Sequence, residues 1–392
     1  MSSSDEPPTG PSLLPVPPAP EYELIETQEA LQQWVDAARA ARSQVGDSRA
    51  CLDTEADSLH HYREKICLLQ VTCGGKFALV DPLAIDDVTS LFALLDEGEL
   101  WFHGADYDLS MLARTYDWRP RVMRDTQIAA RLAGHRQFGL AALVKTSFGL
   151  ELSKASQKAD WSQRPLPEVM RRYAIDDVRF LLSIADQLME ALKGENRIDW
   201  FLESCETLQR DVDRRLSAPK EDPWRVQGCG RLHPKGLAFL KSAWHWRECV
   251  AAERDIPCFR VMSNKQLIGY AEQFEKDQPL HPPGGWRPRW KKAFTDLVRE
   301  GSSQPSSEWP RRLRRERGRF TEEEKKRVDA LCAGREQLAG RLGIESSLLG
   351  SRATLEQVVA SGSSEGLLMN WQRVVLSPIL EPQTLPAPTP AS

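Results

Sequence analysis

Residues 49–55 read Arg49-Ala50-Cys51-Leu52-Asp53-Thr54-Glu55, an apolar run that favours a β-strand and ends in two acidic residues. Side chains alternate between the two faces of a strand, so Asp53 and Glu55 share one face and Thr54 lies on the opposite face. Two carboxylates on one face of a buried strand repel each other and lose their hydration, and a bound cation would relieve both penalties. The alternative interpretation is an ordinary strand end with solvated acids.

A second acidic position follows another apolar run. Trp101-Phe102-His103-Gly104 ends a predicted strand, and Asp108 comes soon after it, near the start of a predicted helix. Strand ends in α/β domains collect ligand-binding side chains, so Asp108 is a candidate metal ligand. An acid in the first helical turn also stabilises the helix dipole, and Asp106 is the better candidate for that role. His103 is interpreted as a packed strand-end residue rather than a catalyst.

A third acidic position lies in the segment Tyr173-Ala174-Ile175-Asp176-Asp177. Tyr173 and Asp177 are four residues apart on a predicted helix, so they share a face. The tyrosine can hold a water molecule beside a metal that the acid binds, although a half-buried tyrosine with a hydroxyl partner fits the pattern too. Asp176 points elsewhere and is expected at the surface or in contact with the metal ligands rather than with the metal.

The first half of the chain alternates strand and helix patterns. Strands are predicted at 22–26, 49–55, 66–72, 76–80 and 100–103, the third and fourth joined by a hairpin turn at Cys73-Gly74-Gly75. Helices are predicted at 28–41, 88–95, 109–115, 124–133, 140–148 and 166–192. These patterns predict an α/β domain with a mixed central sheet over residues 21–197.

Strand patterns fade in the second half, which is predicted to be all-α. Helices are expected at 237–254, 265–274, 321–342 and 354–359. We therefore predict a helical domain at 198–300, a basic linker at 301–319 and a second, weaker helical domain at 320–380. The proline-rich residues 1–20 and residues 381–392 are predicted to be disordered tails.

Composition narrows the class of protein without identifying it. The chain of 392 residues carries a net charge of −4, so only local clusters of basic residues could attract nucleic acid. None of the eight cysteines forms a CxxC pair, which favours reduced thiols and a cytoplasmic location. No apolar run approaches the length of a membrane helix, and nothing indicates an obligate protein partner.

The order Asp-x-Glu, then Asp108, then Tyr-x-x-x-Asp resembles the DEDD exonuclease superfamily in its tyrosine-bearing branch. The resemblance narrows to the ribonuclease D family, in which similar blocks stand in the same order. These blocks are Ile66-Cys67-Leu68-Leu69-Gln70-Val71, Ala78-Leu79-Val80-Asp81-Pro82-Leu83, Arg124-Asp125-Thr126-Gln127 and Asp160-Trp161-Ser162-Gln163-Arg164-Pro165-Leu166.

The resemblance implies a ribonuclease H-like 3′–5′ exonuclease domain with two divalent ions, Mg²⁺ or Mn²⁺. Asp53, Glu55 and Asp177 would hold the first ion, and Asp53 and Asp108 the second, while Tyr173 positions the attacking water. Oxygen ligands alone suit such hard cations. Nucleoside 5′-monophosphates would leave the 3′ end of RNA, and tRNA precursors with 3′ extensions are the expected substrates.

Substrate contacts are expected from Gln70, Trp161 and Arg164. The family pattern has an aromatic residue directly after the glutamate, where this chain has Ala56. Tyr62 or His61 is expected to replace that aromatic residue against the terminal nucleotide.

The helical half resembles HRDC domains, which bind nucleic acid in this family, although helices that only pack on the catalytic domain are the alternative. A basic, tryptophan-containing patch between the two helical domains suits phosphate contact and base stacking. A solvated run of charges is the alternative interpretation. The patch comprises Arg287, Arg289, Lys291, Lys292, Arg311, Arg312, Arg314 and Arg315.

Two other functions fit parts of this pattern. A DNA 3′–5′ exonuclease shares the same carboxylates, and a catalytically silent RNA-binding scaffold would keep the helical domains. The absence of a polymerase or helicase domain favours RNA as the substrate. The presence of all five metal-site residues argues against a silent scaffold.

Overall fold

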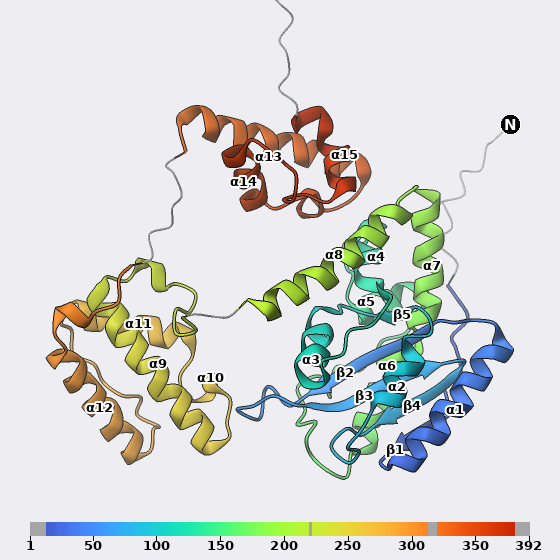
Figure 1. Cartoon of the computed structure of the whole chain (residues 1–392), viewed down its shortest axis with the longest axis horizontal. Coiled ribbons are helices and arrows are strands. Elements are labelled where there is room, and N and C mark those ends of the chain that lie inside the picture. The colour runs from blue at the N-terminus through green and yellow to red at the C-terminus, as the bar shows by residue number, and fades with distance from the viewer. Residues whose placement is uncertain (1–12, 219–221, 313–319, 381–392) are drawn as a thin grey trace, which may run out of the picture. The chain divides into compact units, whose positions relative to one another are not determined.

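The computed structural model describes residues 13–218, 222–312 and 320–380. These residues form two compact units (Figure 1). The first unit contains the described residues up to Glu55, then Ile66–Ser217, and the residues that follow 319. The second contains Ala56–Lys65 and the described residues between 218 and 318. None of the helices in these ranges combines the length and apolar character needed to span a membrane.

A six-stranded sheet organises the first unit, with strand order β1-β4-β3-β2-β5-β6. The pairs β1–β4, β2–β5 and β5–β6 are parallel and β3–β4 is antiparallel, so the sheet is mixed, as predicted. All eight residues of β3 are buried, which places this strand in the core. The strands are β1 (Tyr22–Ile25), β2 (Ala50–Ala56), β3 (Ile66–Cys73), β4 (Lys76–Val80), β5 (Leu100–Phe102) and β6 (Met123–Asp125).

Helices surround the sheet, and α1 and α6 both contact β3 and β4 (Figure 1). The helices of this domain are α1 (Gln28–Val45), α2 (Thr89–Leu95), α3 (Asp106–Tyr116), α4 (Thr126–Leu132), α5 (Leu140–Phe148), α6 (Glu168–Arg179), α7 (Leu181–Gly194) and α8 (Ile198–Ser217). The predicted α/β architecture is therefore confirmed.

The hairpin predicted between β3 and β4 is present. Gly74 and Gly75 have φ values of 59° and 77°, which glycine adopts more readily than residues with side chains. A Cβ atom on Gly74 would also lie 2.5 Å from the backbone nitrogen of Arg42. The turn thus requires glycine at Gly74 for both its conformation and its packing.

Two predictions about this domain were wrong. Residues 124–133, predicted as one helix, contain β6 followed by α4, because Asp125 ends the strand and caps the helix. The helix predicted over 166–192 is broken at Phe180 into α6 and α7. Phe180 is fully buried and packs on Phe148, with ring centroids 5.1 Å apart. The break accompanies the burial of this ring, which depends on a contact distant in sequence.

The first tail also differs from the prediction where it is described. Residues 1–12 and 381–392, which belong to the predicted tails, lie outside the described residues. In residues 13–20, however, the backbone N–H of Leu14 donates to the carbonyl of Ser147 at 2.8 Å. Arg179 donates to the carbonyl of Pro17. This extended segment is therefore held against α5 and α6.

Helices α13 (Glu322–Leu342), α14 (Arg352–Ser361) and α15 (Asn370–Leu380) belong to the first unit. Arg197 donates to the carbonyls of Leu132 and Leu342, at 2.7 Å each. Trp200 of α8 stacks on Trp371 of α15 with ring centroids 4.7 Å apart. The last helical segment is thus docked on the α/β domain.

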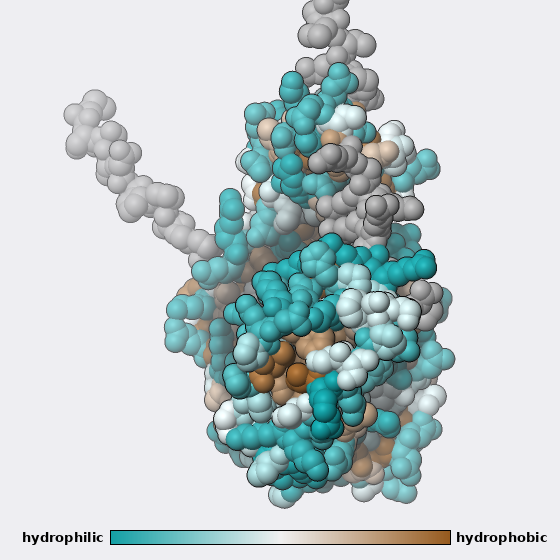
Figure 2. Space-filling view, turned by 90° about the vertical axis from the view of Figure 1, so that its left-hand side faces the viewer, coloured by the Kyte–Doolittle hydropathy of each residue, from teal (hydrophilic) through white to brown (hydrophobic). Residues whose placement is uncertain are grey.

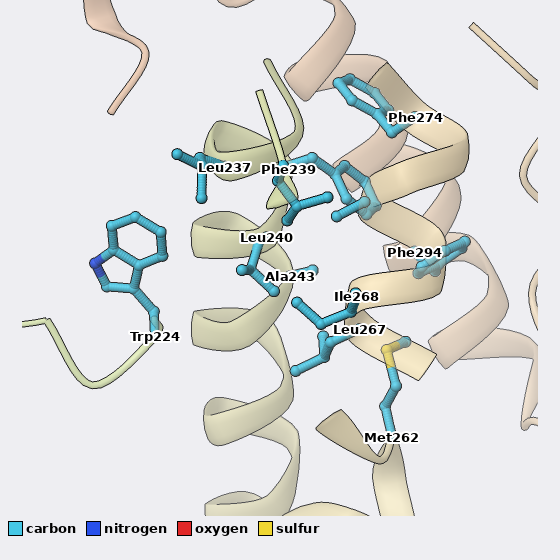
Figure 3. Packing of buried hydrophobic residues seen from close by; sticks show 12 residues of the cluster. Trp224, Leu237, Phe239, Leu240, Ala243, Met262, Leu267, Ile268, Phe274 and Phe294 are labelled. Atoms are coloured by element: carbon cyan, nitrogen blue, oxygen red, sulfur yellow. The ribbon is translucent and has the colours of Figure 1, made fainter. Parts of the chain in front are cut away.

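The second unit is built on α9 (Pro234–Arg254), α10 (Cys258–Val261), α11 (Asn264–Glu275) and α12 (Pro288–Ser303). Its core joins these helices through residues such as Leu240, Ile268 and Phe294 (Figure 3). Helix α12 includes Gly301, which was predicted to begin a linker; here the glycine lies against the ring of Phe274. The face drawn in Figure 2 is mostly hydrophilic, with some apolar residues exposed near its centre.

The loop Ala56–Lys65, which joins β2 to β3, packs within the second unit. Asp255 accepts hydrogen bonds from the backbone N–H of Tyr62 at 3.1 Å and from the His61 ring at 2.7 Å. The Tyr62 hydroxyl donates to Glu248 at 3.2 Å. The predicted exonuclease domain of residues 21–197 therefore contains a loop that the structure groups with the helices. The HRDC type of these helices stays a prediction.

Candidate active site

The three acidic stretches meet in one pocket of about 470 Å³ in the first unit. Strands β2 and β5 are parallel neighbours, so the end of β2 and the start of α3, which follows β5, meet at the same edge of the sheet. Helix α6, the start of α5 and the segment that contains Leu152 and Gln157 line other parts of the pocket. All five predicted metal-site residues line this pocket: Asp53, Glu55, Asp108, Tyr173 and Asp177.

Three of the carboxylates form a tight group. Asp53, Glu55 and Asp177 each offer an oxygen, and these atoms lie within 4.8 Å of one another. They are the same three residues that the family resemblance assigns to the first ion. An acidic cluster of the kind that binds divalent cations therefore lies in this domain.

Asp108 lines the pocket but stands outside the tight group. Its carboxylate accepts a hydrogen bond of 2.6 Å from the hydroxyl of Thr54. Thr54, expected on the opposite face of the strand from Asp53 and Glu55, thus orients the fourth acid. The Asp-x-Glu spacing gave no signal of this contact, because Thr54 and Asp108 are brought together by the packing of α3 on the sheet.

Burial and mutual repulsion make these acids hard to ionise. Burial, followed by the charges of the other acids, raises the pKa of Asp53 well above its ordinary value. The same causes raise the pKa of Glu55 to about 9, and burial followed by the charges of Asp176 and Asp108 raises the pKa of Asp177 to about 8. Burial raises the pKa of Asp108 to about 7, although the hydrogen bond from Thr54 acts to lower it. A bound cation would offset this repulsion, so the donor set fits a metal site.

Tyr173 is kept protonated by its surroundings. Burial and then the charges of Asp177, Glu55 and Asp53 raise the pKa of its phenol. The ring packs beside Trp161, with centroids 6.0 Å apart. Tyr173 therefore presents a hydroxyl donor to the pocket from a supported position.

Asp125, which sequence reasoning did not single out for this role, organises the entrance to α3. Its carboxylate accepts hydrogen bonds from the backbone N–H groups of Gly104 at 3.0 Å, Ala105 at 2.9 Å and Gln127 at 2.7 Å. The loop that leads to Asp108 is thereby tied to the start of α4. An aspartate directly before a helix is a capping signal that could have indicated part of this role.

His103 lies at the strand end, as expected, and also lines the pocket. The hydroxyl of Thr126 donates to the carbonyl of Phe102 at 2.9 Å. The Thr126 hydroxyl has thus used its proton and accepts the 2.9 Å hydrogen bond from Nδ1–H of His103. In a neutral ring, a proton on Nδ1 leaves Nε2 without one. Burial lowers the pKa of His103, so the ring is neutral.

The residues expected to contact substrate do not line this pocket. Gln70 is fully buried in β3 and Trp161 is buried beneath Tyr173. Arg164 forms an ion pair with Asp81 and donates to the carbonyl of Cys67 at 2.7 Å. These three side chains thus have contacts within the protein core, and Tyr62 belongs to the second unit.

Replacing Asp81 by asparagine should lower the free energy of unfolding by about 2–3 kcal/mol, because Arg164 would lose its ionic partner. Asp81 is 1% exposed, so little solvent screens the pair. The measurement is the midpoint of urea unfolding. Glu168→Gln, which removes the surface ion pairs with Arg171 and Arg172, serves as the control and should change the stability by less than about 1 kcal/mol. Equal effects of the two substitutions would contradict the assignment of Arg164 to the core.

The predicted basic patch falls into two parts of the second unit. Arg287 directly precedes α12, Arg289 pairs with Glu253 at 3.1 Å, and Lys291 donates to the carbonyl of Gly284 at 2.7 Å. Lys292 follows in α12. The other part contains Arg311, which is exposed, and Arg312, which donates to the carbonyl of Gly230 at 2.8 Å. Arg314 and Arg315 lie outside the described residues.

The domain that contains this pocket is similar to domains of known proteins. Residues 22–193 match the family model of a 3′–5′ exonuclease. The chain is 34% identical to ribonuclease D of Shewanella sp. over 230 residues, 57% of this chain and 58% of the relative. It is 31% identical to that of Escherichia coli over 254 residues, 64% and 66% of the two chains. Against ribonuclease D of Pseudomonas paraeruginosa it is 30% identical over 369 residues, 91% and 95% of the two chains.

One solved structure has a similar fold over most of the length of this chain. The crystal structure of E. coli RNase D, described as an exoribonuclease involved in structured RNA processing, matches with a TM-score of 0.68 and 26% identity. The match covers 92% of this chain and 97% of that one. Fold and pocket therefore define a protein with a 3′–5′ exonuclease domain. The chain belongs to the ribonuclease D family, as the order of its motifs predicted.

Proposed function

We propose that the chain is a metal-dependent 3′–5′ exoribonuclease that releases nucleoside 5′-monophosphates from the 3′ end of RNA. The observation that carries this proposal is the convergence of Asp53, Glu55, Asp108, Tyr173 and Asp177 on one pocket. Their residue types are those required to bind divalent cations and to orient a water molecule. The retention of all five favours an active enzyme over a silent RNA-binding scaffold.

The cofactor in this proposal is a pair of Mg²⁺ or Mn²⁺ ions. When bound, the ions supply a nucleophilic hydroxide and neutralise the leaving 3′-oxygen. Asp53, Glu55 and Asp177 would hold one ion, and Asp53 and Asp108 the other. The hydrogen bond from Thr54 fixes the orientation of Asp108 for this role. Oxygen-only donors select hard cations over zinc or copper.

Tyr173 acts by hydrogen bonding and not as a base. With its pKa raised, the phenol keeps its proton and donates it in a hydrogen bond to the attacking water. The water is thereby oriented so that its lone pair faces the terminal phosphorus. The buried ring of Trp161 holds Tyr173 in place.

Replacing Tyr173 by phenylalanine should lower kcat by about 10–100-fold and leave KM within about twofold, because the lost hydrogen bond acts on the reacting water and not on RNA binding. Steady-state kinetics on a 3′-labelled RNA measure both constants. Tyr116→Phe is the matched control, since Tyr116 packs against Phe92 and does not line the pocket. A wild-type kcat in the Tyr173 variant would exclude this role.

We propose tRNA precursors with 3′ extensions as substrates and a cytoplasmic location. The test is incubation with a 3′-extended tRNA, with and without EDTA, followed by sizing of the products. A ladder of single-nucleotide steps that EDTA abolishes is expected. DNA oligomers of the same sequence form the comparison, and faster digestion of DNA would favour the alternative, a DNA 3′–5′ exonuclease.

A further inference from the structure

A large groove in the second unit, outside the carboxylate pocket, is lined by cationic side chains. Its volume is about 1350 Å³. The charged residues that line it are Arg225, Arg231, Lys265 and Arg312, and no acidic side chain is among the described lining residues. They come from the turn after Trp224, from the first turn of α11 and from the segment beyond α12. Of these four, only Arg312 belongs to the basic patch predicted from the sequence.

The charges in this groove are only partly neutralised. Arg225 pairs with Asp222 at 2.7 Å, and Arg231 pairs with Glu272 at 2.8 Å. The Arg231 pair is exposed, with 69% of the arginine side chain accessible, so it contributes little stability and can be exchanged for another anion.

Arg312 and Lys265, the other two cationic residues, differ from Arg225 and Arg231. Arg312 donates to the carbonyl of Gly230, a neutral partner that leaves its charge in place. Lys265 is exposed in the first turn of α11, where the helix dipole adds further positive potential. The groove therefore keeps an excess of positive charge.

Two arginines fix the walls of the groove. Arg225 donates to the carbonyl of Arg311 at 3.1 Å, while Arg312 donates to the carbonyl of Gly230 at 2.8 Å. These reciprocal contacts join the turn to the segment that follows α12. Arg225 also lies over the ring of Trp224 at 4.2 Å, and the Trp224 side chain is buried. The cationic groups are thus carried by a framework that does not depend on ligand.

The glycines of the turn leave the backbone accessible. Gly228 has a φ of 96°, a conformation that glycine adopts readily. A Cβ atom on Gly230 would meet nothing within 4 Å, so the absent side chain leaves open space at the groove. A polyanion can therefore approach the backbone and the three exposed cationic side chains, Arg231, Lys265 and Arg312.

We propose that this groove binds the sugar-phosphate backbone of the RNA substrate. Four cations distributed over a wide groove suit a ligand with repeated charges better than a single phosphate ion, and arginine forks match phosphate oxygens. The identification of the ligand as RNA depends on the proposed exoribonuclease function. Contacts to phosphate carry no sequence information, so this groove would hold RNA of any sequence.

The test measures RNA binding without cleavage. Full-length protein in EDTA is titrated against a fluorescent single-stranded RNA of about 20 nucleotides, and the dissociation constant is measured by anisotropy at several salt concentrations. The variant Lys265→Glu with Arg231→Gln should raise the dissociation constant about tenfold. The slope of log K against log salt should fall by about 0.7 for each lost phosphate contact.

The matched control is Lys276→Glu, at the opposite end of α11. Lys276 is exposed and lies about 16 Å along the helix axis from Lys265, and it does not line the groove. The Lys276→Glu variant should bind RNA within about twofold of the unaltered protein. It lowers the net charge by two, against three in the groove variant, and so tests most of the general charge effect. Unchanged melting temperatures of both variants confirm that they fold.

The outcomes separate this inference from the proposed function. Equal RNA affinity in the groove variant and the Lys276 control would overturn the inference. Polyglutamate that competes as well as unlabelled RNA would also overturn the inference, because the groove would then be a site for acidic peptides. Full competition by inorganic phosphate at low concentration would overturn it as well. If the groove variant alone loses RNA affinity, and the unaltered protein cleaves no RNA in Mg²⁺, the groove assignment would be supported and the proposed exoribonuclease function rejected.

Discussion

Replacing Asp177 by asparagine should lower kcat for RNA hydrolysis by at least about 10³-fold, or about 4 kcal/mol of transition-state stabilisation. The substitution keeps the shape of the side chain but removes one of three carboxylates whose oxygens lie within 4.8 Å of one another. The measurement is single-turnover cleavage of a 3′-labelled RNA in Mg²⁺, which separates chemistry from product release.

The control is one residue away. Asp176 pairs with Arg179 at 3.2 Å and does not line the pocket, so Asp176→Asn should keep kcat within about twofold. Comparable losses from the two substitutions would mean that the acidic helix face as a whole, and not the Asp177 carboxylate, supports activity. Normal cleavage by the Asp177 variant would reject the metal-site assignment.

The second large effect is a pH-dependent loss of stability in the metal-free protein. The folded-state pKa is about 7 for Asp108, about 8 for Asp177 and about 9 for Glu55. The same groups titrate near about pH 4 in an unfolded chain. Between these values the folded state binds more protons, so the free energy of unfolding falls as the pH rises through them.

Divalent metal should reverse this loss, because it binds the ionised carboxylates and displaces their protons. At a metal concentration 100 times its dissociation constant, the gain would be about 2.7 kcal/mol. Thermal unfolding in EDTA and in Mg²⁺, at about pH 6 and about pH 9, measures the effect. The difference between the two conditions should grow with pH, and RNA cleavage should cease in EDTA. A melting temperature unaffected by metal at high pH would contradict the interpretation of the raised pKa values.

Local patterns in the sequence predicted the residues of the pocket. Asp53 and Glu55 share a strand face because of the two-residue period, and Tyr173 and Asp177 share a helix face because of the 3.6-residue period. These relations depend only on neighbouring residues. The order of the motifs then identified the family, and the comparisons confirmed that assignment.

Contacts between distant segments account for what the sequence did not reveal. The sequence pattern predicts that Asp125 lies within a helix. In the structure its carboxylate ties the loop before α3 to the start of α4. Arg164 was expected to contact substrate, yet its guanidinium is held by Asp81, 83 residues away. Such pairings depend on strand order and helix packing, which no short period in the sequence encodes.

The sequence by itself determined which side chains carry oxygen ligands, which of them share a face, and to which family the chain belongs. Only the tertiary structure decided that Asp108 is oriented by Thr54 and that the acids are buried together. It also decided that the groove at Arg231 and Lys265 is cationic. The physical reason is that desolvation and charge repulsion depend on distance in space, and these distances exist only after remote segments have packed together.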